Sequence, residues 1–147
     1  MRVNSAALGT AMLLAAVVVG CSVLESKEPA PMYRGTMSSG CAPHDAPSTE
    51  LRLEADNGEG WVSFNLWPAE GVIPPSAVRF DANRPIAQGA YCTGPDICES
   101  AEWGEIVIVS GSSNTDVHGQ WTLGLGDGRV HRGAFEAEWL AIQAFCG

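Results

Sequence analysis

Residues 51–67 read LRLEADNGEGWVSFNLW, and this stretch decides the fold because it predicts a β-hairpin. The dipeptide at 57–58, Asn-Gly, is the preferred centre of a type I′ turn between two antiparallel strands. A two-residue loop at this point places Leu53 opposite Val62. One face of the hairpin then carries only apolar side chains, which is the period-two pattern of strands with one buried face. These side chains are Leu51, Leu53, Ala55, Val62, Phe64 and Leu66.

The opposite face of this hairpin is polar, but it also carries Trp61 and Trp67. Two interpretations are open for this pair of tryptophans. Another strand or the C-terminal tail covers them, or they form an aromatic contact patch for a partner or ligand, since exposed apolar patches mark interaction surfaces. We therefore treat Trp61 and Trp67 as candidate partner contacts.

A second hairpin is predicted over residues 117–125 and 129–139, joined by a three-residue loop in which Gly128 is left-handed. In this register Trp121 lies opposite Gly133, and Phe135 lies opposite Gly119. Each aromatic ring then covers the glycine on the neighbouring strand, which is a common way to support glycine in a sheet.

Further strands are expected between and around these hairpins. Residues 105–110 form a continuous apolar run that is typical of a central strand, and residues 77–80 and 85–92 are weaker candidates. The tail at 139–145 fits either a strand or one helical turn. Short strands separated by Gly/Pro loops predict an all-β fold, a small antiparallel sandwich or barrel of about six to eight strands.

The chain has five cysteines, and the four that follow position 40 form an even set: Cys41, Cys92, Cys98 and Cys146. An even number in an exported protein predicts two disulfides. Three pairings are possible, and we favour Cys92–Cys98 across a Gly-Pro turn with Cys41–Cys146 joining the start of the domain to its end. The spacing matches neither a Cys-x-x-Cys redox pair nor a zinc site.

The N-terminus has the features of an export signal. Arg2 is followed by an uncharged, mostly apolar stretch that is short for a membrane-spanning helix and ends in Val18-Val19-Gly20-Cys21. This tetrapeptide resembles the lipobox of bacterial lipoproteins. The resemblance implies cleavage before Cys21 and acylation, including palmitoylation, of this residue, which anchors the protein to a membrane. Ser22, where an inner-membrane lipoprotein usually carries Asp, favours the outer membrane, on its periplasmic side.

These features divide the chain into three parts. Residues 1–20 are the expected signal peptide, residues 21–40 the lipidated cysteine with a flexible Pro-containing tether, and residues 41–147 a disulfide-stapled β domain.

The charge and the motifs of the chain argue against several classes of function. The formal net charge of −9 argues against nucleic acid as a partner, because phosphate contacts need Lys and Arg. His118 and His131 lie on opposite faces of the second hairpin and His44 lies far away in sequence, so surface histidines are expected rather than a metal site. The loop around Ser110 lacks a nucleophile-elbow motif, and no phosphate-binding Gly motif occurs.

We therefore expect a lipid-anchored cell-envelope protein that is not an enzyme and needs no cofactor. A binding or structural role fits best, and one version is inhibition of a cationic exported protein, towards which an acidic domain is steered. Small lipid-anchored β-barrel lysozyme inhibitors perform such a role, although their residues are not recognisable in this sequence. An envelope hydrolase acting on cell-wall or lipid substrates and an accessory subunit of a membrane assembly are the alternatives.

Overall fold

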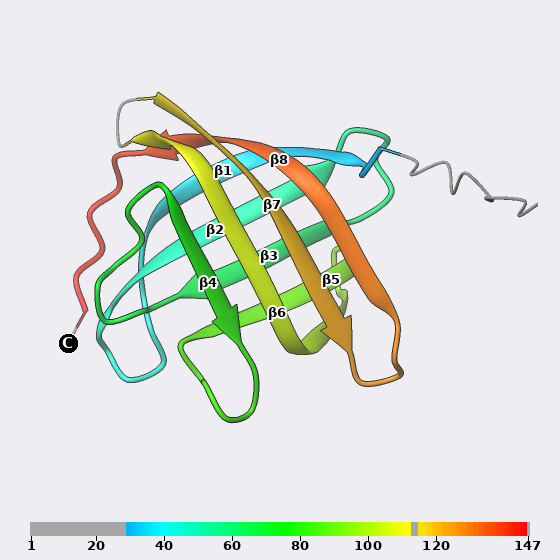
Figure 1. Ribbon diagram of the computed structural model, residues 1–147, viewed down its shortest axis with the longest axis horizontal. Coiled ribbons are helices and arrows are strands. Elements are labelled where there is room, and N and C mark those ends of the chain that lie inside the picture. Colours follow the sequence, from blue (N-terminus) through cyan, green and yellow to red (C-terminus); the bar gives the residue numbers. More distant parts are fainter. Residues whose placement is uncertain (1–28, 113–114, 147) are drawn as a thin grey trace, which may run out of the picture.

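The computed structural model describes residues 29–112 and 115–146, which form eight β-strands and no helix (Figure 1). The strands are β1 (Met32–Cys41), β2 (Pro47–Ala55), β3 (Trp61–Leu66), β4 (Ser76–Phe80), β5 (Ala87–Gly94), β6 (Ile97–Ser112), β7 (Thr115–Leu125) and β8 (Val130–Leu140). The all-β fold and the strand number confirm the expectation from the sequence.

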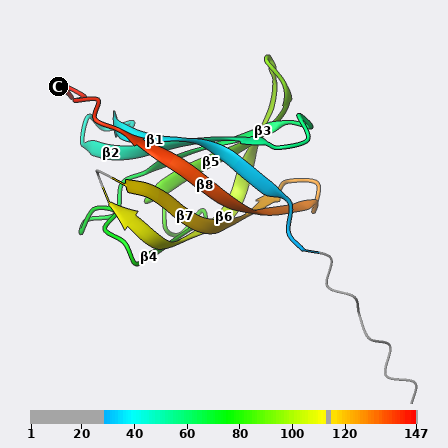
Figure 2. The same cartoon turned by 90° about the horizontal axis from the view of Figure 1, so that it is seen from above.

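Seven of the strands close into a barrel in the order β6-β5-β3-β2-β1-β8-β7, and β7 pairs back onto β6. β4 is an additional strand on β6. An odd number of strands cannot close with every neighbour antiparallel, so one pair must be parallel, and that pair is β1 with β8. This parallel pair departs from the purely antiparallel arrangement expected from the sequence. Figure 2 shows the barrel flattened, with β1, β2, β3 and β5 on one side and β4, β6 and β7 on the other.

Both hairpins have the register expected from the sequence. Leu53 pairs with Val62 in the first hairpin, and the six apolar side chains on that face are buried. In the second, Trp121 pairs with Gly133 and Phe135 pairs with Gly119, while Gly128 has a φ of 86°.

The turn of the first hairpin differs from the expected type I′. That turn needs positive φ at both central residues. Gly58 has a φ of 75°, but among the described non-glycine residues only Asp45 has a positive value, so the φ of Asn57 is negative. Instead, the Gly58 N–H donates to the Ala55 carbonyl at 2.9 Å. Gly58 has the left-handed conformation, and Asn57 does not. The pairing is unaffected because the longer loop is still centred between residues 57 and 58, as the hydrogen bond from the Ala55 N–H to the Gly60 carbonyl at 3.1 Å shows.

The expected N-terminal boundary of the folded domain, Cys41, is wrong, because β1 begins before it. The sequence predicts a tether over residues 21–40, yet residues 32–40 form most of β1 and hydrogen-bond to strands on both sides. Tyr33 and Met37 are buried, and Gly35 lies so close to β2 that a Cβ there would stand 1.8 Å from the Arg52 carbonyl oxygen. Glycines and serines give β1 little strand propensity of its own, so its structure depends on its two neighbours. The folded domain therefore begins at Met32 rather than at Cys41.

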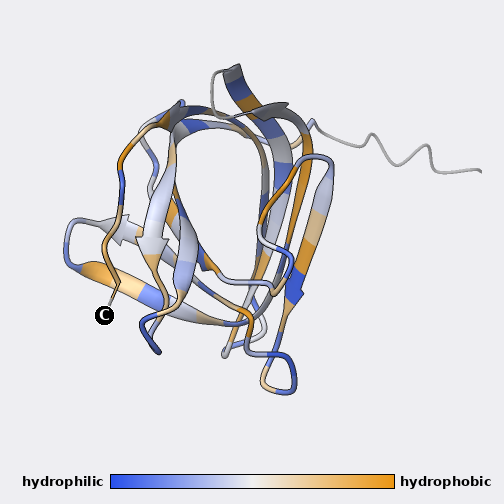
Figure 3. Cartoon of the chain, turned by 90° about the vertical axis from the view of Figure 1, so that its left-hand side faces the viewer, coloured by the Kyte–Doolittle hydropathy of each residue, from blue (hydrophilic) through white to orange (hydrophobic). Residues whose placement is uncertain are grey.

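The strands enclose a common interior (Figure 3), which is filled by apolar side chains. Trp121 is its largest fully buried side chain, with Tyr33 edge-on at 4.9 Å between ring centroids. No polar or charged residue of the described chain is buried in this core. The barrel therefore has a packed core, and ligand sites must be sought on its outside and at its ends.

β6 changes partners along its length, which opens the barrel wall at one place. Its first part pairs with β5 as far as Ser100, and its later part pairs with β4 from Gly104 onward. The described β5–β6 ladder starts at Ala90, so the beginning of β5 lies beside the split. The expected strands at 77–80 and 85–92 correspond to β4 and β5 and flank this opening.

Both expected disulfides are confirmed. Cys92–Cys98 closes the β5–β6 turn, and Cys41–Cys146 ties the end of β1 to the C-terminal tail. Of the tail expected as a strand or helical turn, only Trp139 and Leu140 belong to β8, and residues 141–146 have no regular structure.

The expected signal peptide, the lipobox and Cys21 lie outside the described residues. Within residues 29–112 and 115–146, no helix is long and apolar enough to cross a membrane.

Candidate ligand groove

A groove of about 850 Å³ crosses the outer face of the β1-β2-β3-β5 side of the barrel. Strand pairing places its floor in two rows of outward-facing residues that run perpendicular to the strands. The first row is Thr36, Arg52, Ser63, Ala90 and Ser100, and the second row is Ser38, Glu50, Asn65 and Gln88.

The floor is low because most of its side chains are small. Three serines, a threonine and an alanine cover little of the backbone, and the longer side chains of the two rows are Arg52, Glu50, Asn65 and Gln88. The first row spans five strands, from β1 to β6. With neighbouring strands about 4.8 Å apart, this row is about 19 Å long, which matches about six residues of extended polypeptide.

Trp61 and Arg52 form one wall. The Arg52 guanidinium lies over the Trp61 ring, 4.4 Å from its centroid, and a terminal nitrogen of Arg52 stands 3.9 Å from a Glu54 carboxylate oxygen. The indole N–H of Trp61 donates to the Gly94 carbonyl at 3.4 Å. Trp61, one of the two candidate contact residues, is therefore half-buried and held in place at the groove edge.

The other walls come from segments outside the main strands. Leu140 and Ile142 of the C-terminal tail line the groove, and the tail is held nearby by the Cys41–Cys146 disulfide. The loop after β4 contributes Asp81, Ala82 and Pro85. The lining also includes apolar residues of the interior, Leu51, Phe64, Phe80, Ala87 and Gly89, so the groove reaches the core beside the split between β4 and β5.

The groove is acidic. Glu50, Asp81 and Glu102 line it and are exposed, and none of the three forms an ion pair with another described residue. Arg52 is the one cation among the lining residues, and its charge is shared with Glu54. Asp81 is held in position because its Oδ1 accepts the backbone N–H groups of Asn83, at 2.7 Å, and of Arg84, at 3.1 Å. Glu50 thus lies on the floor, and Asp81 and Glu102 border it, against the single cation Arg52.

Trp67, the second candidate contact residue, lies outside this groove. Its indole N–H donates to the Pro85 carbonyl at 2.9 Å, and the His44 ring meets it edge-on at 6.1 Å between centroids. Trp67 therefore holds the β4–β5 loop against the end of β3, and the structure does not bring the two tryptophans into one patch.

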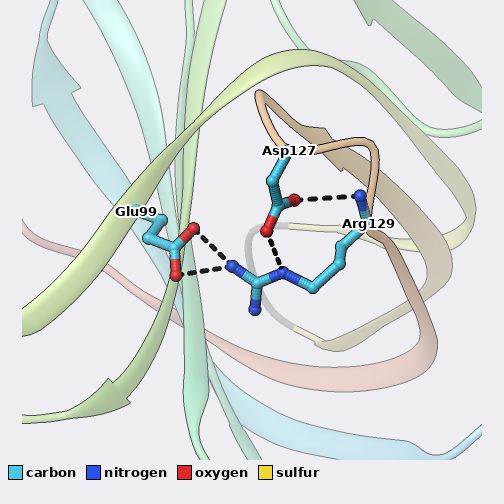
Figure 4. Close-up of polar contacts among 3 residues, drawn as sticks. All are labelled: Glu99, Asp127 and Arg129. Carbon is cyan, nitrogen blue, oxygen red and sulfur yellow. Dashed lines mark hydrogen bonds and ion pairs between the residues drawn. The ribbon is translucent and has the colours of Figure 1, made fainter.

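A second polar cluster closes the barrel end at which β1 begins (Figure 4). There one terminal nitrogen of Arg129 donates to both Glu99 carboxylate oxygens, at 2.6 and 2.7 Å, while its Nε contacts the Asp127 carboxylate. The Arg129 backbone N–H donates to Asp127 Oδ1 at 3.0 Å, and this bond is the main reason why the pKa of Asp127 is lowered. These ion pairs join the β7–β8 turn to β6, so Arg129 has a structural role.

His131 packs beneath this cluster, stacked on Tyr91 with 3.9 Å between ring centroids. Burial lowers the pKa of His131, and the positive charge of Arg129 lowers it further. His131 is therefore a partly exposed histidine at the barrel end, where the beginning of β8 turns it inward beside Leu123.

Tyr91 also lies beside Tyr33 at this end of the barrel. Burial, together with neighbouring Tyr91, raises the pKa of Tyr33 to about 12.

His118 faces outward, and His131 faces inward, as their register predicts. Among the described residues, no group of three or more His, Cys, Asp or Glu side chains is placed to hold a metal ion.

An apolar pocket of about 340 Å³ lies towards the opposite end of the barrel. Its walls include Met37 and Val117 of the barrel and the loop residues Val72, Ile73 and Pro74. Nothing in its lining is ionised, and it is smaller than the groove.

The polar outer face predicted for the first hairpin supplies Arg52, Ser63 and Asn65, but the other half of the groove was not predicted. Gln88, Ser100 and Glu102 reach the site because β5 pairs with β3 and then with β6. The sequence holds no local signal for that strand order.

No family model matches the chain, and no curated protein or solved structure is significantly similar to it.

Proposed function

We propose that this chain is a lipid-anchored cell-envelope protein whose barrel is a non-catalytic binding module for a cationic exported protein. The observation that carries the proposal is an excess of unpaired negative charge on the surface. Nine exposed carboxylates of the described chain form no ion pair within it: Asp45, Glu50, Glu59, Glu70, Asp81, Asp96, Glu102, Asp116 and Glu138.

The arginines cannot neutralise this excess. Arg34, Arg52, Arg79 and Arg129 are each bound to a carboxylate already, which leaves Arg84 and Arg132 without an ion pair among the described residues. A surface with this imbalance attracts basic proteins at long range and repels acidic ones.

The alternative of an envelope hydrolase finds less support. Catalysis needs an acid, base or nucleophile with a shifted pKa beside the bound substrate. The groups with shifted pKa, such as His131 and Asp127, lie at the barrel end outside the groove, and Asp127 is paired with Arg129. His131 is stacked on Tyr91 and Asp127 is bound to Arg129, so both groups have structural neighbours.

The test uses the purified protein and a basic lysozyme as the cationic probe. We expect calorimetry to detect binding at low salt that weakens about tenfold or more at high salt, because salt screens contacts between exposed charges. The matched control is the same lysozyme with its lysines acetylated, which keeps the shape and removes the positive charge of every lysine. Absence of binding, or equal binding of the acetylated form, would contradict the proposal.

A further inference from the structure

We propose that the outer groove is the recognition site for the cationic partner, and that it takes an extended, lysine- or arginine-containing segment of that protein. This inference rests on the proposed function and adds where the partner binds and in which conformation.

The shape of the groove argues for an extended chain. Its two floor rows cross the strands from Thr36 on β1 to Ser100 on β6, and five of their nine side chains are Ser, Thr or Ala. The length of about 19 Å suits about six extended residues, and the low floor leaves room for a backbone.

The charges argue for a basic segment. Glu50 stands on the floor, Asp81 on the loop wall and Glu102 on β6, so carboxylates border the groove from three different elements. In an extended segment every second side chain faces the same way, so alternate lysines or arginines reach these carboxylates while the residues between them point to solvent. Arg52 does not oppose this arrangement, because its guanidinium is turned onto Trp61.

The hydrogen-bonding groups of the floor are suited to a polypeptide backbone. Asn65 donates its Nδ2–H to the Cys41 carbonyl at 3.0 Å, and its Oδ1 is buried without a hydrogen-bond partner within the described chain. Ser63 and Gln88 lie beside it in the neighbouring floor positions. The Ser63 hydroxyl and the Gln88 amide offer donors and acceptors to the backbone of a bound segment without selecting a particular side chain.

The experiment compares two triple variants that change the net charge equally. The groove variant is Glu50→Gln, Asp81→Asn and Glu102→Gln, and the amide introduced at position 81 keeps a side-chain oxygen to cap the turn. The control variant is Glu70→Gln, Asp96→Asn and Asp116→Asn, three exposed carboxylates that do not line the groove. The probe is a short peptide of alternating lysine and serine, with a glutamate–serine peptide of the same length as its negative control.

An exposed ion pair changes affinity about two- to threefold, so three together predict about a tenfold loss for the groove variant. The control variant should lose much less affinity for the peptide, at most the two- to threefold expected for one exposed ion pair. A second pair of variants tests shape without changing charge: Ser63→Phe fills the groove floor, whereas Thr122→Phe adds the same ring to the outer face of β7. Ser63→Phe should abolish peptide binding, and Thr122→Phe should leave it intact.

Equal losses in the two triple variants, with Ser63→Phe still binding, would overturn the groove as the site while leaving charge-driven binding of a basic partner in place. Failure of the unmodified protein to bind either the peptide or the basic lysozyme would overturn the proposed function as well. Thermal unfolding is measured for every variant, to check that the barrel is folded in each comparison.

Discussion

The Cys41–Cys146 disulfide should stabilise the barrel about twice as strongly as Cys92–Cys98. In the chain-entropy model, a cross-link stabilises the fold by restricting the unfolded chain, and the effect grows with the length of the closed loop. The two bridges differ greatly in this respect, since they join residues 105 and 6 positions apart. The model gives about 4.8 kcal/mol for the long loop and about 2.4 kcal/mol for the short one.

The perturbation is removal of each bridge separately. Cys41→Ala with Cys146→Ala opens the long loop at two half-buried positions. For the short loop, Cys98→Ala is combined with Cys92→Val, because the Cys92 side chain is fully buried and a smaller residue would leave a cavity. Small domains have unfolding free energies of about 5–15 kcal/mol, so loss of the long bridge removes a large share of the total.

Equilibrium urea unfolding, followed by tryptophan fluorescence, to which the buried Trp121 contributes, measures both losses. The variant without the long bridge should also show the larger m-value, because its unfolded chain exposes more surface. Equal losses, or a larger loss for the short bridge, would refute the reasoning from loop length and indicate that the tail contributes little to the folded state.

Three further predictions test other parts of the account. Gly35→Ala should unfold or severely destabilise the barrel, by about 3 kcal/mol or more, because its Cβ would collide with the Arg52 carbonyl oxygen, and urea unfolding measures the loss. The free energy of unfolding should fall as pH drops below about 6.5, the ordinary pKa of histidine. Burial lowers the pKa of His131 in the folded chain, so below this pH the unfolded chain binds more protons. Unfolding midpoints measured against pH should show a smaller fall for His131→Gln. Intact mass of membrane-purified protein should show acyl groups on an N-terminal Cys21 and four thiols only after reduction, and an unlipidated mass would contradict the proposed anchor.

Much of the fold could be predicted because its strongest signals are local. Asn-Gly at 57–58 and the glycines at 126 and 128 fix two hairpin registers, and period-two burial then assigns the faces of four strands. The disulfides followed from an even cysteine count and from a short turn between Cys92 and Cys98.

What escaped prediction depends on pairing between distant segments. β1 is glycine- and serine-rich, so only its neighbours β2 and β8 make it a strand. Because β1 was not predicted as a strand, the odd number of barrel strands and the parallel pairing of β1 with β8 were not predicted either. The groove needs β3 beside β5, and its walls come from the β4–β5 loop and the C-terminal tail, none of which a local pattern indicates.

The account's central claim is that a basic partner binds the outer groove through its carboxylates. Amide NMR spectra of the isotopically labelled protein, titrated with the lysine–serine peptide at low and high salt, test it most directly. We predict shifts concentrated at Ser63, Gln88 and Glu102 that vanish at high salt. Shifts spread evenly over the acidic surface, or confined to β7 and β8, would contradict the claim.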